Sequence, residues 1–339
     1  MINRILVYVH HDRDNIIDDH VLFCIQQLKK SYKKIIFIHN NIELSKEYEN
    51  KLSNDAFIVK RKDKHRDWGA WKDYLLSNWD YLREFDELSL LNSSVYGPVF
   101  PLEPILEKMT SSDQDFWTIT KWSTYIPHHL DVIPHYQPYF ITFKEKVFKS
   151  QEFQKFWKDF NVNSDDYWEL VIHGEVGLSN ALKNASFNGK ALTDDFDIRP
   201  IEDMGHCEPF SQNSTSYLIE KYKIPFVKIK SFKTNENRPL SIATHIFNAL
   251  KNTGSDYPIS LIINHTKRTQ PLSTWRSFPQ SIKIFDSYQK QKSIQKELKL
   301  AVFFHVFFIE KFHKYAKMLK NIHQHYDLYI TTNNLEKKS

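Results

Sequence analysis

The sequence predicts an α/β protein with a mostly parallel β-sheet, helices on both sheet faces, and a C-terminal β-α-β appendage. One observation behind this prediction is that apolar runs of strand length alternate with segments whose apolar residues recur at helical spacing. In such an alternation the helices join parallel strands and cover both faces of the sheet. A second observation is that several expected strands end in polar residues, at the edge where open α/β sheets bind ligands.

The opening β-α-β unit is expected over residues 4–41. Its strands are "RILVYVHH" and "KKIIFIHNN", and the helix between them is "DNIIDDHVLFCIQQLKK". Asp18 and Asp19 lie early in this helix and Lys29 and Lys30 lie late. This charge order complements the helix dipole, so it supports the helix assignment.

The alternation continues along the chain. Further strands are expected at "DAFIVKRKD", "ELSLLNSS", "DFWTIT" and "PYFITFK", and helices at "WGAWKDYLLSNWDYL", at "FPLEPILEKMTS" and near residues 145–160 and 174–186. The segment "KWSTYIPHHLDVIPHYQ" is predicted to be long and irregular, which is typical of a functional site. The tail again predicts a strand, a helix and a strand. The expected domains are therefore residues 1–232, a connector with helices at 233–299, and a β-α-β unit at 300–339.

Composition indicates a folded protein without a nucleic-acid partner. Hydrophobic residues make up 41% of the 339 residues and aromatic residues 15%, which is enough for a sizeable core. The 46 basic and 41 acidic residues leave a scattered net charge of +5. That excess is too small to indicate nucleic-acid binding, although it suits an anionic ligand or an acidic membrane surface.

The same sequence favours a cytoplasmic location. Cys24 and Cys207 are the only cysteines and lack metal-ligand spacing, which fits a reducing compartment. The N-terminus "MINRILVYVHHDRDN" is expected to be a strand because charge interrupts it early, unlike a signal peptide. No apolar run approaches the ~18 residues of a membrane helix. We therefore expect a soluble protein, or one bound peripherally at the cytoplasmic membrane.

A basic run precedes one expected helix and predicts an anion site. In "KRKDKHRDWGAWKDY" the run ends at Arg66 and Asp67, and Gly69 lies where the helix begins. Free backbone N–H groups and the helix dipole favour phosphate at such a terminus, and glycine lets backbone approach a ligand. The alternative is a solvated basic loop in which Asp67 is an ordinary N-cap.

Polar residues that end three of the expected strands are further candidates for ligand binding. They are His10, His11 and Asp12 after the first strand, Asn40 and Asn41 after the second, and Asn92, Ser93 and Ser94 after the fourth. At the carboxyl ends of parallel strands such groups can hold a base or a ribose. The alternative for the last triplet is that it only caps the next element. His10 and His11 do not suggest a metal pair, since neighbouring strand residues point to opposite faces.

Glu175 in "VIHGEVGLSNAL" is the candidate general base, placed at a helix start between Gly174 and Gly177, which are expected to leave room for a ligand. A carboxylate can serve as a base if it faces a cleft, whereas an acid at a helix start can also merely complement the dipole. Asp194 and Asp195 are rival candidates, as is Asp115. The dinucleotide, P-loop and hydrolase-elbow motifs are missing from the sequence.

Taken together, several motifs resemble the rhamnan synthesis protein F family of bacterial glycosyltransferases, which act in surface polysaccharide assembly. They are "VYVHHDRDNIIDDHV", "IIFIHNN", "HRDWGAWKDYL", "LSLLNSSVYGPVFPLE", "DFWTIT", "HYQPYFITFKEKVFKSQEFQKFW", "HGEVGLSNAL" and "IPFVKIKSF". The resemblance covers residues 4–232. The tail looks like the beginning of the second domain carried by longer family members.

The resemblance implies a GT-A-like nucleotide-binding fold and transfer of a sugar, with L-rhamnose from dTDP-L-rhamnose as the expected donor and a growing or lipid-linked glycan of a rhamnan, capsule or O-antigen as acceptor. The Asp-x-Asp that holds Mg²⁺ or Mn²⁺ in metal-dependent GT-A enzymes corresponds here to Asn92, Ser93 and Ser94. Hydroxyls and an amide are poor ligands for a hard cation, so we assign no metal ligand and expect this triplet to hold ribose or sugar hydroxyls.

Residue roles follow from the resemblance as expectations. His11, Asp12, Asn40, Arg66, Asp67 and Gly69 are expected to bind the donor together with the triplet. Glu175 is expected to be the base of an inverting transfer. Acceptor contacts are expected from His128, His129, His135, Tyr136 and Gln137, because aromatic and hydrogen-bonding side chains together suit a sugar. The alternative is a non-catalytic subunit that binds a nucleotide sugar or glycan.

Overall fold

The computed structural model describes residues 2–125, 132–161, 166–194, 214–232, 242–271, 300–306, 312–322 and 325–332. These residues fall into two compact units, Met1–Lys283 and Ile284–Ser339, which are described separately. Within the described part of the chain, no helix is both long and apolar enough to cross a membrane.

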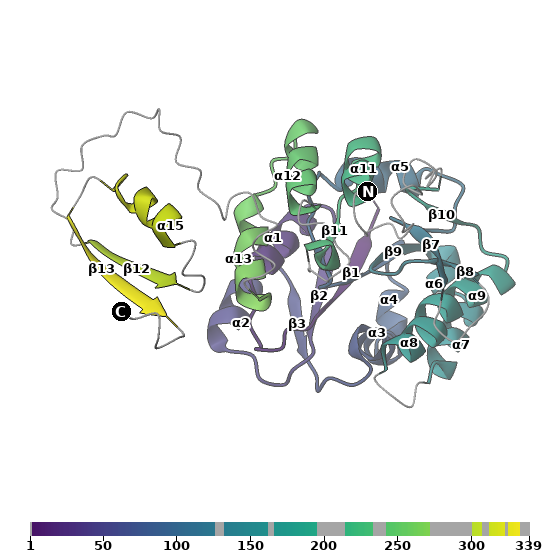
Figure 1. Ribbon diagram of the computed structural model, residues 1–339. Coiled ribbons are helices and arrows are strands. Elements are labelled where there is room, and N and C mark those ends of the chain that lie inside the picture. The colour runs from purple at the N-terminus through teal and green to yellow at the C-terminus, as the bar shows by residue number, and fades with distance from the viewer. Residues whose placement is uncertain are drawn as a thin grey trace. The chain divides into compact units, whose positions relative to one another are not determined.

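A seven-stranded sheet forms the centre of the first unit, in the order β10-β6-β9-β4-β1-β2-β3 (Figure 1). Its strands are β1 (Arg4–His10), β2 (Lys34–His39), β3 (Phe57–Lys60), β4 (Glu87–Asn92), β6 (Phe116–Thr118), β9 (Phe140–Lys144) and β10 (Gly189–Ala191). β9 runs antiparallel to both of its neighbours, and the other pairs are parallel. The predicted α/β class with a mostly parallel sheet is confirmed.

Helices cover both faces of this sheet because its inner strands are apolar on both sides. In β1, Leu6 and Tyr8 belong to one hydrophobic cluster, while Ile5, Val7 and Val9 belong to the other. Successive strand residues point to opposite faces, so this alternation divides the core into two layers.

The helices divide between these two layers (Figure 1). Those that contribute to the cluster of Leu6 are α1 (Asp19–Leu28), α2 (Lys46–Leu52), α5 (Glu103–Thr110), α11 (Ser214–Tyr222), α12 (Ile242–Asn252) and α13 (Ile259–Thr269). Those that contribute to the cluster of Ile5 are α3 (Arg66–Ser77), α4 (Trp79–Leu82), α6 (Glu145–Phe148), α7 (Gln151–Asp159), α8 (Tyr167–Leu170) and α9 (Gly177–Asn184).

Two short antiparallel pairs complete the first unit. β5 (Val95–Tyr96) pairs with β11 (Val227–Lys228), which runs into the 3-10 helix η2 (Ile229–Phe232). β7 (Lys121–Tyr125) pairs with β8 (Val132–Tyr136). The second pair corrects the prediction of a long irregular segment there, because two stretches that contain aromatic and β-branched residues pair as strands.

The predicted boundary after residue 232 is also corrected. Helices α12 and α13 lie in the expected connector, yet Ile246, Leu250 and Ile262 are fully or almost fully buried in the first core. Their apolar faces are part of the first unit, which continues to Lys283.

The second unit contains the predicted strand, helix and strand. They are β12 (Leu300–Val306), α15 (Phe312–Leu319) and β13 (Tyr326–Thr332), and the two strands pair in parallel. The expected β-α-β appendage is therefore present.

Candidate functional site

The carboxyl ends of β1, β2 and β4 meet at one edge of the sheet. Beyond β1, the N–H of His11 donates to Oγ of Ser93 over 3.1 Å, and the N–H of Asn40 donates to the carbonyl of His10 over 3.0 Å. Strand pairing sets this register, since His10 lies opposite His39 and Val9 opposite Asn92. The structure thus brings together His11, Asn40 and Ser93, three of the predicted donor-binding residues.

Two histidines lie beneath this edge. Nδ1 of His10 and Nδ1 of His39 are 3.1 Å apart, and both rings are buried. Burial, as the larger cause, and the neighbouring His39 together lower the pKa of His10 to about 3. His10 is therefore neutral at physiological pH.

Asn92 links the end of β4 to the first turn of α3. Its Nδ2 donates to Oδ2 of Asp67 over 2.6 Å, and its Oδ1 accepts hydrogen bonds from the N–H and the hydroxyl of Ser94 at 3.2 and 2.5 Å. The amide oxygen of Asn92 is thus already engaged. Burial and the negative charge of Glu175 raise the pKa of Asp67, against the lowering effect of the Asn92 hydrogen bond.

The start of α3 is built by an unusual backbone turn. His65 and Arg66 have φ values of 57° and 51°, in the left-handed region that side chains rarely adopt. This turn brings the Lys64 carbonyl so close that a Cβ on Gly69 would lie 2.1 Å from its oxygen. Gly69 therefore accommodates the protein's own loop, which differs from the predicted approach to a ligand. The carbonyl of Arg66 accepts a hydrogen bond of 3.1 Å from Nδ2 of Asn40.

Glu175 lies within a helix, which corrects the prediction that it begins one. α8, the π-helical turn η1 (Val171–Val176) and α9 follow one another without a break, because residues 170, 171, 176 and 177 all keep right-handed helical angles. The expected space for a ligand beside Gly174 is filled by Trp68, since a Cβ there would lie 2.4 Å from the indole ring.

Charged neighbours keep Glu175 ionised. Its Oε2 lies 3.4 Å from Nε2 of His135, and 21% of its side chain is exposed. Burial tends to raise the pKa of Glu175, but the His135 hydrogen bond and the positive charges of Lys228 and Lys230 outweigh it and leave that pKa below its ordinary value. An ionised, partly accessible carboxylate can accept a proton from a substrate.

Lys228 is a member of this site that the sequence analysis did not single out. It lies on β11 opposite Val95, and its Nζ lies 4.7 Å from the centroid of the Tyr139 ring. Burial lowers the pKa of Lys228, while the charges of Glu175 and Asp67 oppose this shift. A lysine enclosed by apolar residues in "IPFVKIKSF" was the signal that could have found it.

The predicted acceptor-binding residues have different surroundings. His135 is buried and paired with Glu175. Tyr136 donates its hydroxyl to the Gly189 carbonyl over 2.9 Å, and Oε1 of Gln137 accepts from the Thr120 hydroxyl over 2.6 Å. These contacts hold both side chains inside the protein, and their acceptor role stays a prediction.

Two further acceptor candidates, His128 and His129, lie outside the described residues, as does Asp195. Asp194 pairs with Lys121 at 2.5 Å and also accepts the N–H of Ala191. Asp115 precedes β6 at the opposite edge of the sheet, where both its oxygens lie 2.9 Å from Nζ of Lys146. This placement separates Asp115 from the strand ends that carry Asn92 and His10.

Asp12 belongs to an ion cluster with a residue on α13. Its carboxylate accepts the N–H groups of Asp14 and Ile16 at 2.9 and 3.0 Å and pairs with the guanidinium of Arg268. Arg268 also pairs with Asp18. The sequence analysis missed Arg268 because it lies 256 residues from Asp12.

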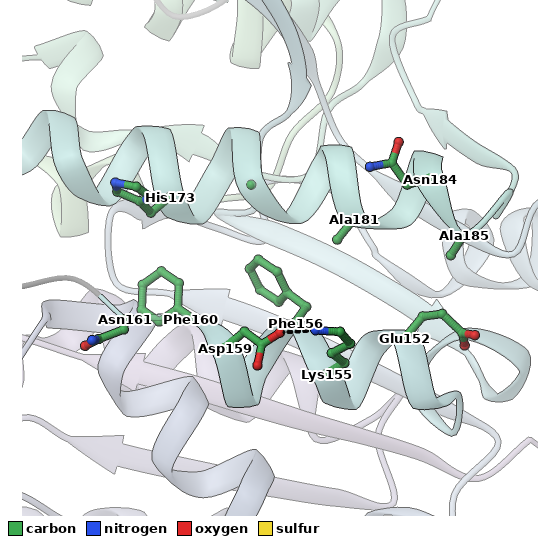
Figure 2. A pocket seen from close by; sticks show the side chains of 11 residues that line it. Glu152, Lys155, Phe156, Asp159, Phe160, Asn161, His173, Ala181, Asn184 and Ala185 are labelled. Carbon is green, nitrogen blue, oxygen red and sulfur yellow. Dashed lines mark hydrogen bonds and ion pairs between the residues drawn. The ribbon is translucent and has the colours of Figure 1, made fainter.

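A groove of about 480 Å³ lies between α7 and α9 (Figure 2). Phe156 and Phe160 point into it from α7 and the residue after it, facing His173 on η1 and Ala181 on α9. None of the predicted site residues lines this groove. It is separate from the cluster at the strand ends.

Comparison with known proteins relates this chain to one family. The family model described as "Rhamnan synthesis protein F" matches residues 35–339. No match was found among curated proteins.

Several solved structures resemble the chain at low identity. Glycosyltransferase GlyE of Streptococcus pneumoniae TIGR4 is 12% identical, over 99% of this chain and 81% of that one, with a TM-score of 0.39. Mannosyltransferase Ktr4p from S. cerevisiae is 11% identical, over 53% of this chain and 65% of that one, with a TM-score of 0.34. A cytidylyltransferase from Leptospira borgpetersenii is also 11% identical, over 56% and 76%, with a TM-score of 0.34. We draw no conclusion about chemistry from these likenesses.

Proposed function

The chain belongs to the rhamnan synthesis protein F family, and we propose that it is an inverting glycosyltransferase that uses Glu175 as its base. The observation that carries this proposal is the grouping of Glu175 with Asp67, Asn92, His135 and Lys228 at the carboxyl ends of the central strands. Ligands of open α/β sheets bind in the crevice at this edge.

The proposed reaction is a single displacement at the anomeric carbon of the donor sugar. Glu175 removes the proton of an acceptor hydroxyl, the hydroxyl oxygen forms a bond to the anomeric carbon, and the bond to the nucleoside diphosphate breaks. The proton stays on Glu175 until solvent removes it. Glu175 is ionised before the acceptor arrives and can therefore accept a proton, although its lowered pKa makes it a weaker base than an ordinary glutamate.

Positive charge next to Glu175 suits the leaving group. Lys228 and Lys230 are close enough to lower the pKa of Glu175, and Arg66 precedes Asp67 at the start of α3. We propose that these cations offset the charge that develops on the departing diphosphate, a stabilisation that is strong where water is excluded.

The end of β4 does not provide a ligand set for a divalent cation. Mg²⁺ and Mn²⁺ prefer several oxygen ligands with carboxylates among them, and Asp67 is the carboxylate that contacts this strand end. The amide oxygen of Asn92 is occupied by Ser94. We therefore propose a reaction that uses no metal ion, and we propose that Ser93 and Asn40 contact hydroxyl groups of the donor.

Family membership supports a proposal for the donor and the acceptor. We propose that dTDP-L-rhamnose is the donor and that a growing surface polysaccharide, a rhamnan, capsule or O-antigen chain, is the acceptor. We propose that this transfer from a nucleotide sugar takes place in the cytoplasm, at or near the inner face of the membrane.

Two measurements on the purified chain test the proposal. A thermal-shift panel of nucleotide sugars should show selective stabilisation by dTDP-L-rhamnose, because a ligand that binds only the native state raises the unfolding temperature by mass action. Release of the nucleoside diphosphate should then depend on a glycan acceptor. Donor binding without turnover with any acceptor would instead indicate a nucleotide-sugar-binding subunit.

A further inference from the structure

An acidic and histidine-rich cluster joins α13 to the start of α1, apart from the residues of the proposed reaction. Asp18 is the N-cap of α1, His20 lies in its first turn, and His265 lies on α13. Each offers one oxygen or nitrogen atom, and these three atoms all lie within 4.8 Å of one another. Nε2 of His265 is 3.8 Å from Oδ2 of Asp18, and the two imidazole centroids are 4.4 Å apart.

His20 has an unsatisfied polar atom in this cluster. Only 4% of the residue is exposed, and its Nδ1 has no hydrogen-bond partner among the described residues. Buried polar atoms without partners are rare in folded proteins, since each loses its hydrogen bonds to water.

We propose that Asp18, His20 and His265 bind one divalent transition-metal ion, and that zinc is the ion they fit best. Two imidazoles and one carboxylate form a donor set typical of zinc sites with a fourth, open position. Ligands about 2.0 Å from a tetrahedral ion lie about 3.3 Å apart. The observed 3.8 Å between His265 and Asp18 therefore needs only a small closing movement.

The surroundings of His265 support its role as a ligand. Its Nδ1 lies 2.6 Å from the hydroxyl of Tyr96, so Nε2 is the nitrogen on the side of Asp18. Metal-binding histidines usually donate their second ring N–H to a fixed partner, which orients the ring. Tyr96 is fully buried and provides such a partner.

The charges of the cluster favour a cation despite the presence of Arg268. Asp12, Asp14 and Asp18 all pair with its single guanidinium, so the three carboxylates outnumber the one cation beside the two imidazoles. Asp18 can bind an ion while it is paired with Arg268, because a carboxylate has about four acceptor positions. A bound ion would thus add a second connection between α1 and α13.

Metal titration of the purified, metal-free full chain tests this inference. One Zn²⁺ should bind per chain and raise the unfolding temperature, and Co²⁺ at the same site should give the visible absorption of a tetrahedral complex. The variants His265→Gln and Asp18→Asn should each weaken Zn²⁺ binding at least 100-fold. His245→Gln changes an exposed histidine on α12 and should leave binding unchanged.

A crystallographic measurement protects the test against misfolded variants. Anomalous diffraction from crystals of the unaltered chain grown with ZnCl₂ should place the ion between His20 and His265. Failure of the unaltered chain to bind Zn²⁺, or an ion located at another place, would overturn the proposal. Full Zn²⁺ affinity in folded His265→Gln would overturn it as well.

Discussion

Asn92 at the end of β4 donates a hydrogen bond of 2.6 Å to the carboxylate of Asp67 in the first turn of α3. The carboxylate beside the end of β4 therefore belongs to a helix residue that lies 25 residues earlier in the chain, and not to β4 itself. Burial and the negative charge of Glu175 raise the pKa of Asp67, and the hydrogen bond from Asn92 opposes this rise. Loss of this bond, or a further negative charge beside it, would therefore disfavour the ionised form of Asp67.

Changing Asn92 to Asp should make stability depend on pH. The new carboxylate would lie next to Asp67, where the Asn92 amide now donates a hydrogen bond of 2.6 Å. Repulsion between the two carboxylates would raise the pKa of Asp67 further. When a carboxyl group has a higher pKa in the folded protein than in the unfolded chain, the free energy of unfolding falls as pH rises from the unfolded pKa to the folded one. We expect Asn92→Asp to lower the free energy of unfolding by about 1–3 kcal/mol at pH 8 and by less at pH 5.

Urea unfolding at the two pH values measures this effect, with Asn92→Ala as the control that removes the donor without adding charge. Equal losses for Asn92→Asp at pH 5 and pH 8 would show that charge repulsion is not the cause.

Glu175→Gln should abolish turnover while the protein still binds its donor. The amide keeps the shape of the side chain but cannot accept the acceptor's proton, and loss of a general base typically reduces rate about 100- to 10,000-fold. Glu169→Gln is a matched control, since Glu169 belongs to the same continuous helix and pairs with His173. Rates of diphosphate release and thermal shifts with donor should be compared for both variants. A rate for Glu175→Gln near that of the unaltered protein would transfer the role to another carboxylate.

Two glycines of the same helix should respond in opposite ways to alanine. A Cβ at position 174 would lie 2.4 Å from the Trp68 ring, whereas the nearest atoms to one on Gly177 are 3.5 and 3.6 Å away. Gly174→Ala should therefore destabilise the protein by about 1–3 kcal/mol through overpacking. Gly177→Ala should stabilise it by up to about 1 kcal/mol, because alanine favours the helix. Thermal unfolding of the two variants measures the difference, and similar behaviour would contradict the packing described for Trp68.

Arg268→Gln should weaken the attachment of α13 to α1. It leaves the carboxylates of Asp12, Asp14 and Asp18 without their shared cation, and we expect a loss of about 3 kcal/mol near pH 7. Asp12 has a lowered pKa, with the Arg268 hydrogen bond opposing the effect of burial. A carboxylate with a lowered pKa contributes stability above its ordinary pKa and loses it as pH falls through the folded value. The difference between the two proteins should therefore shrink at acidic pH, below about 4.

Arg13→Gln serves as the control for that measurement. Arg13 pairs with the same Asp14, but 84% of its side chain is exposed, so its loss should change stability by less than about 1 kcal/mol. A comparable loss in both variants would mean that the buried position of Arg268 is unimportant.

The layers of this protein and most of its strands can be predicted from its amino-acid sequence. Leu6, Tyr8 and their alternating neighbours had to be buried on two faces, and polar residues such as Asn92 had to follow where the strand left the core. These features depend on local patterns of apolar and polar residues, and such patterns are readable without knowing which segments meet.

The membership of the site and the pKa shifts of its groups, in contrast, depend on how the chain packs in three dimensions. Asp67, Glu175 and Lys228 come from α3, a π-helical turn and β11. The charges of Glu175 and Asp67 act on the pKa of Lys228, and the charge of Lys228 acts on the pKa of both carboxylates. The spaces beside Gly69 and Gly174, which the sequence predicted to be open to a ligand, are filled by the Lys64 carbonyl and the Trp68 ring. Burial and charge interactions depend on distance in space, and contacts between residues so far apart along the chain exist only once the sheet and its helices have packed.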